Sequence, residues 1–223
     1  ADKSMLTIAE ENLKGTKAKL VNGNFRDIKR VATENGFTAV DGIVFDLGVS
    51  NVHFSDMSRG FSFRNPEADL DMRLNPEAQQ VKASDLLNML RIDQLSEMFG
   101  RKLANGIREF RETKKFQKVG DFLSLFPEKR TGKLHPATKE FLALRIAVNS
   151  ELENLMAALP QAYELLGLGG VLAVVSFHSL EDEIVKDFMR SKGRKNEAIK
   201  PTDEEVARNP KSRSAILRFI ERK

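Results

Sequence analysis

The feature that most constrains the fold of this chain is a strand–helix–strand rhythm that stops and later resumes. In the first fifty residues, a predicted helix over 3–14 is followed by a short strand over 19–21, a helix over 25–34 and an apolar strand over 42–47. Alternation of this kind is typical of a parallel sheet with helices packed on its faces.

The rhythm is interrupted between about residues 80 and 135, where short helices follow one another without a convincing strand. A long helix is then predicted behind Pro136, followed by a fully apolar strand over 171–175 and a final strand within "SRSAILRFIERK". We therefore predict an α/β sheet domain that carries a helical insertion on the substrate side. The expected parts are 1–74 (first part of the sheet domain), 75–138 (insertion) and 139–223 (second part of the sheet domain).

Charge is unevenly distributed along the chain. The net charge is +4, but the segments 101–140 and 186–223 each carry a local charge of +6. Two basic regions on an acidic body favour a polyanionic partner, although solvated helix faces would give the same pattern. The chain has no cysteine and no apolar run of about 20 residues, so disulfides, thiolate metal sites and a membrane span are not expected.

Polar residues follow two of the predicted strands. "GIVFD" ends on Asp46, and "GVLAVVS" ends on Ser176. In open parallel sheets, ligands bind beyond the carboxyl ends of the strands. If the two strands are neighbours, one rim would gather Asp46, Ser50, Asn51, Ser176 and His178. Asp46 could instead be a turn acid, and His178 could stabilise the start of a helix.

Other residues in these regions also allow two interpretations. Phe61 and Phe63 could pack in a core, and the segment 69–73 could be a turn closed by a salt bridge. The chain has no phosphate-binding G-x-x-x-x-G-K-[ST] loop, no G-x-G-x-x-G and no G-x-S-x-G elbow. The three histidines show no metal-ligand spacing, so we expect no metal site.

Four segments, taken in order, resemble one known family. They are "DGIVFDLGVSNVHFSDMSRGFSFRNPEADLDMRLNP", "LHPATKEFLALRIAVNSEL", "GGVLAVVSFHSLEDEIVKDFM" and "NPKSRSAILR". Together they resemble the bacterial-type ribosomal RNA small-subunit methyltransferase H family, also called MraW. Four ordered blocks that extend over nearly the whole chain are far more specific than a single motif.

The resemblance implies a class I, Rossmann-like methyltransferase sheet with an inserted helical domain, and S-adenosyl-L-methionine as the cofactor. The implied reaction is methylation of the exocyclic N4 of a cytidine in the decoding centre of small-subunit ribosomal RNA. Phe25 matches an adenine contact of the family, and Asp46 matches an acid close to the cofactor. Asp2 matches the second acid of a "DxDP" motif, and His53 stands where the family often has glutamine.

The family's first strand and its glycine-rich "GxGGHS" loop lie upstream of that motif, and neither is in this chain. We therefore expect an N-terminally incomplete sheet, and a polypeptide that alone binds the cofactor weakly or not at all. The alternative function is a cofactor-binding-deficient fragment or a non-catalytic RNA-binding module derived from the family. The implied partner is small-subunit ribosomal RNA or a 30S-type particle, without a membrane. A homodimer is also implied, in the bacterial cytoplasm or, for an organelle-targeted homologue, the mitochondrial matrix.

The amine of cytosine is a poor nucleophile because its lone pair conjugates with the ring, so an acceptor for its N–H groups would favour methyl transfer. Asp46 is the first candidate acceptor, followed by Asn51, Ser176 and His178. The base must leave its stack, and Phe61 or Phe63 could then stack on it. Six basic residues are candidate phosphate contacts: Arg108, Arg111, Lys114, Lys115, Lys211 and Arg213.

Overall fold

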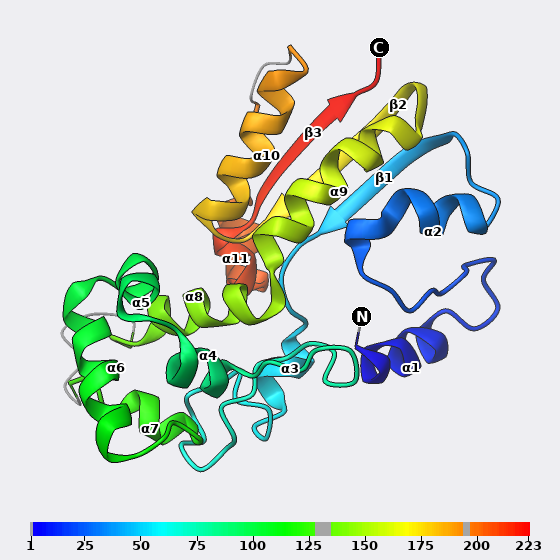
Figure 1. Cartoon of the computed structure of the whole chain (residues 1–223). Coiled ribbons are helices and arrows are strands. Elements are labelled where there is room, and N and C mark those ends of the chain that lie inside the picture. Colours follow the sequence, from blue (N-terminus) through cyan, green and yellow to red (C-terminus); the bar gives the residue numbers. More distant parts are fainter. Residues whose placement is uncertain (1, 128–134, 194–196) are drawn as a thin grey trace. The chain divides into compact units, whose positions relative to one another are not determined.

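The computed structural model of the 223-residue chain describes residues 2–127, 135–193 and 197–223. It is a mixed α/β structure with a small three-stranded sheet (Figure 1). The helices of its first half are α1 Lys3–Asn12, η1 Phe25–Asp27, α2 Ile28–Glu34, α3 Asn51–Ser55, α4 Ala83–Met89, α5 Ile92–Phe99, α6 Arg101–Thr113 and α7 Val119–Leu123. Those of its second half are α8 Thr138–Asn149, α9 Glu151–Leu165, α10 Ser179–Ser191, α11 Asp203–Arg208 and η2 Pro210–Ser214.

The sheet has the order β1-β2-β3, formed by β1 Val40–Asp46, β2 Leu166–Ser176 and β3 Ile216–Glu221. β1 and β2 run parallel, with Asp46 opposite Val175, whereas β3 runs antiparallel to β2. A strand was predicted from the sequence in each of these three places. The parallel pairing brings the carboxyl ends of β1 and β2 to the same edge of the sheet.

Helices α9 and α10 cover one face of this sheet, as Figure 1 shows. Leu155 and Leu159 of α9 and Val185 and Met189 of α10 are almost fully buried against apolar side chains of the strands. Burial of each such side chain contributes about 1.5–3 kcal/mol relative to leaving it in water. On the strands, the side chains that face these helices are Phe45, Leu172, Val174 and Ile220.

The strand predicted over 19–21 is not formed. Leu20 and Val21 are 38% and 44% exposed, and neither belongs to a strand or a bridge in the described part of the chain. A strand needs a partner for its backbone N–H and C=O groups, and a short apolar run alone does not supply one. This segment is therefore a solvent-exposed connection between α1 and η1.

The long helix predicted after Pro136 is interrupted at Ser150. This residue has the left-handed φ of 48° and caps α8, so the chain turns before α9 begins. Beside it, Asn149 is only 8% exposed, and its amide joins α8 to a distant loop. It donates to Met72 O at 2.8 Å and accepts from Leu74 N at 2.9 Å. The break is thus held by side-chain hydrogen bonds rather than by glycine or proline.

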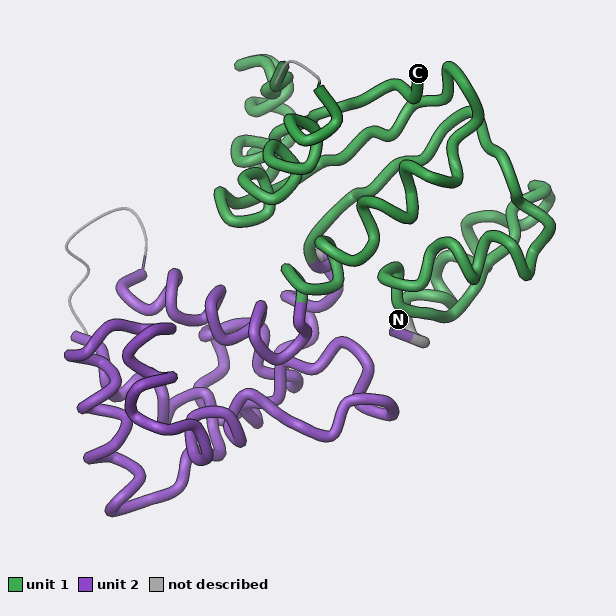
Figure 2. The backbone as a smooth tube through the Cα atoms, turned by 45° about the horizontal axis from the view of Figure 1, so that its top comes forward, with its two compact units in different colours: residues 1, 3–48, 151–223 green, residues 2, 49–150 purple. Residues whose placement is uncertain are grey.

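The chain forms two compact units, drawn in green and purple in Figure 2. Unit 1 contains the described residues 3–48 and 151–223, and unit 2 contains residue 2 and the described residues of 49–150. Unit 2 has its own core of helices and loop segments, which includes Leu70, Phe116 and Phe122. The domain boundaries expected at 74 and 138 remain a prediction. No helix in the described ranges is long and apolar enough to cross a membrane.

Candidate functional site

In unit 1, the polar residues that follow β1 and β2 meet at one edge of the sheet. Asp46 is exposed at the end of β1, and the next residue, Leu47, donates its N–H to Val175 O at 3.1 Å. Ser176 and His178 follow at the end of β2. The fold therefore brings together Asp46, Ser176 and His178, three of the candidates chosen from the sequence.

Ser176 faces the interior of unit 1. It is 2% exposed, and its Oγ lies 3.4 Å from Ile216 O and 3.5 Å from a carboxylate oxygen of Asp182. Asp182 in turn accepts two hydrogen bonds from the buried guanidinium of Arg218, at 2.7 and 2.9 Å. The hydrogen bond from Arg218 lowers the pKa of Asp182, and burial only partly opposes it. Ser176 thus sits beside a charged pair that joins α10 to β3.

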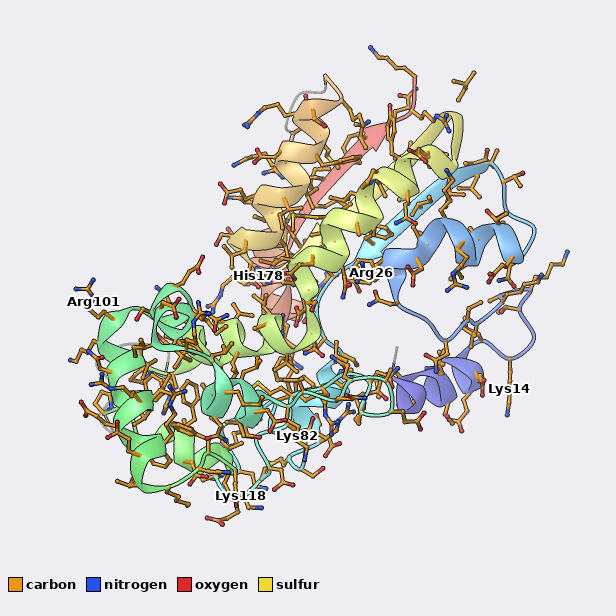
Figure 3. The ribbon with its side chains drawn as sticks, in the orientation of Figure 1. Lys14, Arg26, Lys82, Arg101, Lys118 and His178 are labelled. Carbon is orange, nitrogen blue, oxygen red and sulfur yellow. The ribbon has the colours of Figure 1, made fainter. Side chains whose placement is uncertain are left out.

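His178 is the N-cap of α10, which Figure 3 shows at the start of this helix. Its Nδ1 accepts a hydrogen bond from Glu181 N at 3.3 Å. Glu181 is only 3% exposed, and its side-chain Oε2 accepts the N–H of Phe177 at 2.9 Å. This N-cap position agrees with the alternative interpretation of His178 as a residue that stabilises the start of a helix. Sequence reasoning missed Glu181, which carries no motif of its own.

Phe25 lies at the start of η1 in unit 1, 39% exposed. Its ring packs edge-on against Phe45, with 5.7 Å between the ring centroids. Phe45 directly precedes Asp46 on β1. A half-exposed aromatic ring therefore lies close to the end of the strand that carries the exposed carboxylate.

In unit 2, Asp2 and His53 form a buried polar cluster with Arg59. His53 is 4% exposed, and its Nε2 lies 3.0 Å from Asp2 Oδ2, while Arg59 Nη1 donates to the same oxygen at 2.5 Å. Arg59 also donates to Arg73 O at 2.7 Å. The guanidinium balances the charge of Asp2, because a buried carboxylate is stable only when it is paired.

The loop that carries Arg59 is tightly packed. Gly60 has a φ of +74°, and a Cβ at this position would collide with the carbonyl oxygen of Asp69 and lie 3.0 Å from Asp71 N. Next to it, Phe61 is 6% exposed, and its ring centroid lies 5.3 Å from that of His53.

The remaining candidates near the loop differ in accessibility. Phe63 is half-buried and stacks on His135, with 4.6 Å between the ring centroids. Phe63 is therefore the more accessible of the two candidate phenylalanines. Asn51 is the first residue of α3, and its side chain lies outside the described part of the structure. Asp71 and Arg73 form the salt-bridged turn that was the alternative interpretation of 69–73, at 2.7 Å.

The six basic candidates differ in what they contact. Arg111 donates to Leu90 O at 2.7 Å and approaches two further carbonyls at the end of α4, so it caps that helix. Lys114 pairs with Asp121 Oδ1 at 2.7 Å. Lys114 is itself exposed, but its ammonium group is already paired. The other four are exposed as well: Arg108, Lys115, Lys211 and Arg213. These four are better placed than Arg111 and Lys114 to contact phosphates.

Comparisons with known proteins agree on one family. The model of the MraW methylase family matches residues 1–223. A protein of Dehalococcoides mccartyi is 39% identical over all of this chain and 72% of its own length. One of Methylacidiphilum infernorum is 44% identical over 92% of this chain and 74% of its own length. One of Dictyoglomus thermophilum is 39% identical over all of this chain and 80% of its own length. All three are named ribosomal RNA small subunit methyltransferase H.

Proposed function

Because the chain belongs to the MraW methylase family, we propose that it transfers a methyl group from S-adenosyl-L-methionine to the N4 of a cytidine in small-subunit ribosomal RNA. The names of its relatives support ribosomal RNA as the substrate class. The decoding centre as the target, a 30S-type particle as the partner and a homodimer belong to the same proposal. So does a class I methyltransferase sheet in which unit 2 contains the inserted helical domain.

The residues of unit 1 fit a methyl-donor cofactor. Phe25 offers a half-exposed ring for an adenine, and Asp46 offers a carboxylate close to a positively charged sulfonium. When bound, the cofactor supplies the electrophilic methyl group. The family resemblance also assigns Asp2 and His53 to cofactor binding, and within unit 2 Arg59 holds Asp2 in place.

Asp46 is the best candidate acceptor for the N–H groups of the target amine, and its exposed position at the end of β1 is the main support for the proposal. It is exposed at the end of β1, whereas Ser176 is buried and His178 uses Nδ1 to cap α10. An acceptor on the N–H groups draws electron density back to the nitrogen and favours the pyramidal geometry needed for attack. Backbone carbonyls after Asp46 could assist, and Asn51 remains a second choice.

The base would leave its stack, and Phe63, which is half-buried, is the more accessible of the two phenylalanines that could stack on it. The exposed Arg108, Lys115, Lys211 and Arg213 would hold phosphates. Each phosphate contact contributes roughly 0.9 to the slope of log affinity against log salt for duplex nucleic acid and about 0.7 for single strands.

The test is Asp46→Ala in the protein, assayed for methyl transfer to small-subunit particles and mapped to the modified base. We expect a loss of about 100-fold or more, the size seen when one charge-stabilising group is removed from an active site. Asp41→Ala is the matched control, because Asp41 is an exposed carboxylate near the other end of the same strand. Activity of Asp46→Ala within a few-fold of the unaltered protein would exclude Asp46 as the acceptor.

A further inference from the structure

The end of β2 carries a second group of ligand-type side chains, beyond the residues used in the proposed reaction. Glu151, the first residue of α9, and His178 and Glu181, at the start of α10, each offer one nitrogen or oxygen atom, and these atoms all lie within 4.8 Å of one another. All three residues belong to unit 1. Glu181 is buried, and the other two are half-buried, so the group is not an open surface cluster.

Glu181 is held in a fixed orientation within this group. Its side chain is 4% exposed, and one carboxylate oxygen accepts the N–H of Phe177 at 2.9 Å. The other oxygen, Oε1, lies 3.2 Å from Nε2 of His178. Two ligands of one metal ion lie about 3–3.4 Å apart when each bond is about 2.0–2.2 Å long. The His178–Glu181 pair already has this separation, and the ligand atom of Glu151 lies within 4.8 Å of both.

The Nε2 atom of His178 points toward the two carboxylates and has no hydrogen bond within the described part of the chain. Nε2 is buried and makes no hydrogen bond with any described residue, although Oε1 of Glu181 is close. A buried polar atom without a hydrogen bond is uncommon and calls for a missing ligand or ion. Here it faces one carboxylate at contact distance, with a second carboxylate nearby.

We propose that Glu151, His178 and Glu181 bind one divalent transition-metal ion. One imidazole nitrogen and two carboxylate oxygens suit Mn²⁺, Fe²⁺, Co²⁺ or Zn²⁺, and a softer thiolate site is excluded because the chain has no cysteine. The ion would be held by three side chains and would keep at least one position open for water or a ligand. The spacing of the histidines gives no sign of this site, because two of its three ligands are glutamates and one of these comes from another helix.

Binding of the ion changes the proton on His178. In the metal-free ring, Nδ1 accepts from Glu181 N, so the proton is on Nε2. A metal ion on Nε2 requires that proton to leave, and a proton then occupies Nδ1. The N–H of Glu181 loses its acceptor as a result, and the first turn of α10 loses its side-chain cap. Binding of the ion therefore breaks the hydrogen bond from Glu181 N to His178, and the start of α10 is held by coordination to the ion instead.

The test is a titration of the whole, chelator-treated protein with Mn²⁺, followed by calorimetry and by the electron paramagnetic resonance signal of the free ion. We expect one ion per chain. In Glu181→Gln and in Glu151→Gln, the affinity for Mn²⁺ should fall by about tenfold or more relative to the unaltered protein. Glu183→Gln and Glu153→Gln are matched controls, because these exposed glutamates lie on the same two helices, and both should bind like the unaltered protein. None of these readouts requires methyl transfer.

A second measurement reports on the ring itself, in the unaltered protein. Nitrogen NMR of ¹⁵N-labelled His178 should show the proton on Nε2 without metal and on Nδ1 with Zn²⁺. It also decides the proposal if Glu181→Gln fails to fold. Absence of binding at millimolar Mn²⁺, equal binding in both glutamine variants, or an unchanged ring tautomer with Zn²⁺ would each overturn the site.

Discussion

Each unit has a polar junction that joins segments far apart in the sequence, and the two junctions differ in their chemistry. In unit 1 it is the ion pair of Asp182 with Arg218, and in unit 2 it is the amide of Asn149. Each joins segments that are far apart in the sequence: the pair joins α10 to β3, and the amide joins α8 to the loop after Met72. The pair uses opposite charges, and Asn149 uses a neutral group that donates and accepts at once. The stability of unit 1 therefore depends on whether Asp182 is ionised. The stability of unit 2 depends on the hydrogen-bond geometry of the Asn149 amide, which does not titrate.

The largest expected effect is on the amide. Asn149→Ala removes hydrogen bonds to Met72 O, Leu74 N and Arg145 O, and leaves buried backbone groups without partners. We expect the free energy of unfolding to fall by about 3–4 kcal/mol, since each unsatisfied buried group costs about 1–3 kcal/mol. Chemical denaturation measures this, and Gln80→Ala, an exposed amide in the loop that Asn149 anchors, should change it little. A loss below about 1 kcal/mol would mean that water replaces the amide.

The charged pair should be next in size. Asp182→Asn leaves the guanidinium of Arg218, which is 7% exposed, without its charge partner. The expected loss of unfolding free energy is about 2–3 kcal/mol, at the lower end for a broken buried pair because the asparagine can still accept one hydrogen bond. Asp187→Asn is the control on the same helix, because its partner Arg190 is mostly exposed. Equal effects at the two positions would contradict the role given to burial.

The smallest expected effect is a difference in how the melting temperature depends on pH, which distinguishes the ion pair of Asp182 from the amide of Asn149. Arg218 lowers the pKa of Asp182, so the pair stabilises the fold above the unfolded-state value of about 3.9 and loses this contribution as pH falls through the lowered folded value. Melting temperatures between pH 7 and pH 3 should therefore fall more steeply for the unaltered protein than for Asp182→Asn. Asn149→Ala should keep the slope of the unaltered protein, because the amide does not titrate. Parallel curves for all three proteins would contradict the comparison.

β1 and β2 could be predicted from the sequence because each contains a continuous apolar run, and β3 because most of its residues are apolar. The rhythm of the chain predicted a parallel sheet but left open whether β1 and β2 are neighbours. Their pairing in the structure brings Asp46, Ser176 and His178 to one edge. The run over 19–21 shows the limit of this reasoning, because a strand exists only with a partner that the run itself does not specify.

Other features have no local signal in the sequence. Serine has no preference for the left-handed backbone that Ser150 adopts, so the break between α8 and α9 could not be seen. Glu181 looked like one more acidic residue in the first turn of a helix. Its contact with His178 depends on side-chain orientation, and the approach of Glu151 depends on how α9 packs beside α10. Packing of this kind is decided by the whole unit and not by spacing.

Gly60 has a consequence for how the sequence of this protein can change over time. Its neighbours Arg59 and Phe61 act through their side chains, so a replacement of similar size and charge can preserve part of their role. Gly60 acts through the lack of one, because two backbone segments already touch there. Substitutions at positions 59 and 61 can therefore be gradual. At position 60 every other amino acid adds a Cβ, so no conservative substitution exists there.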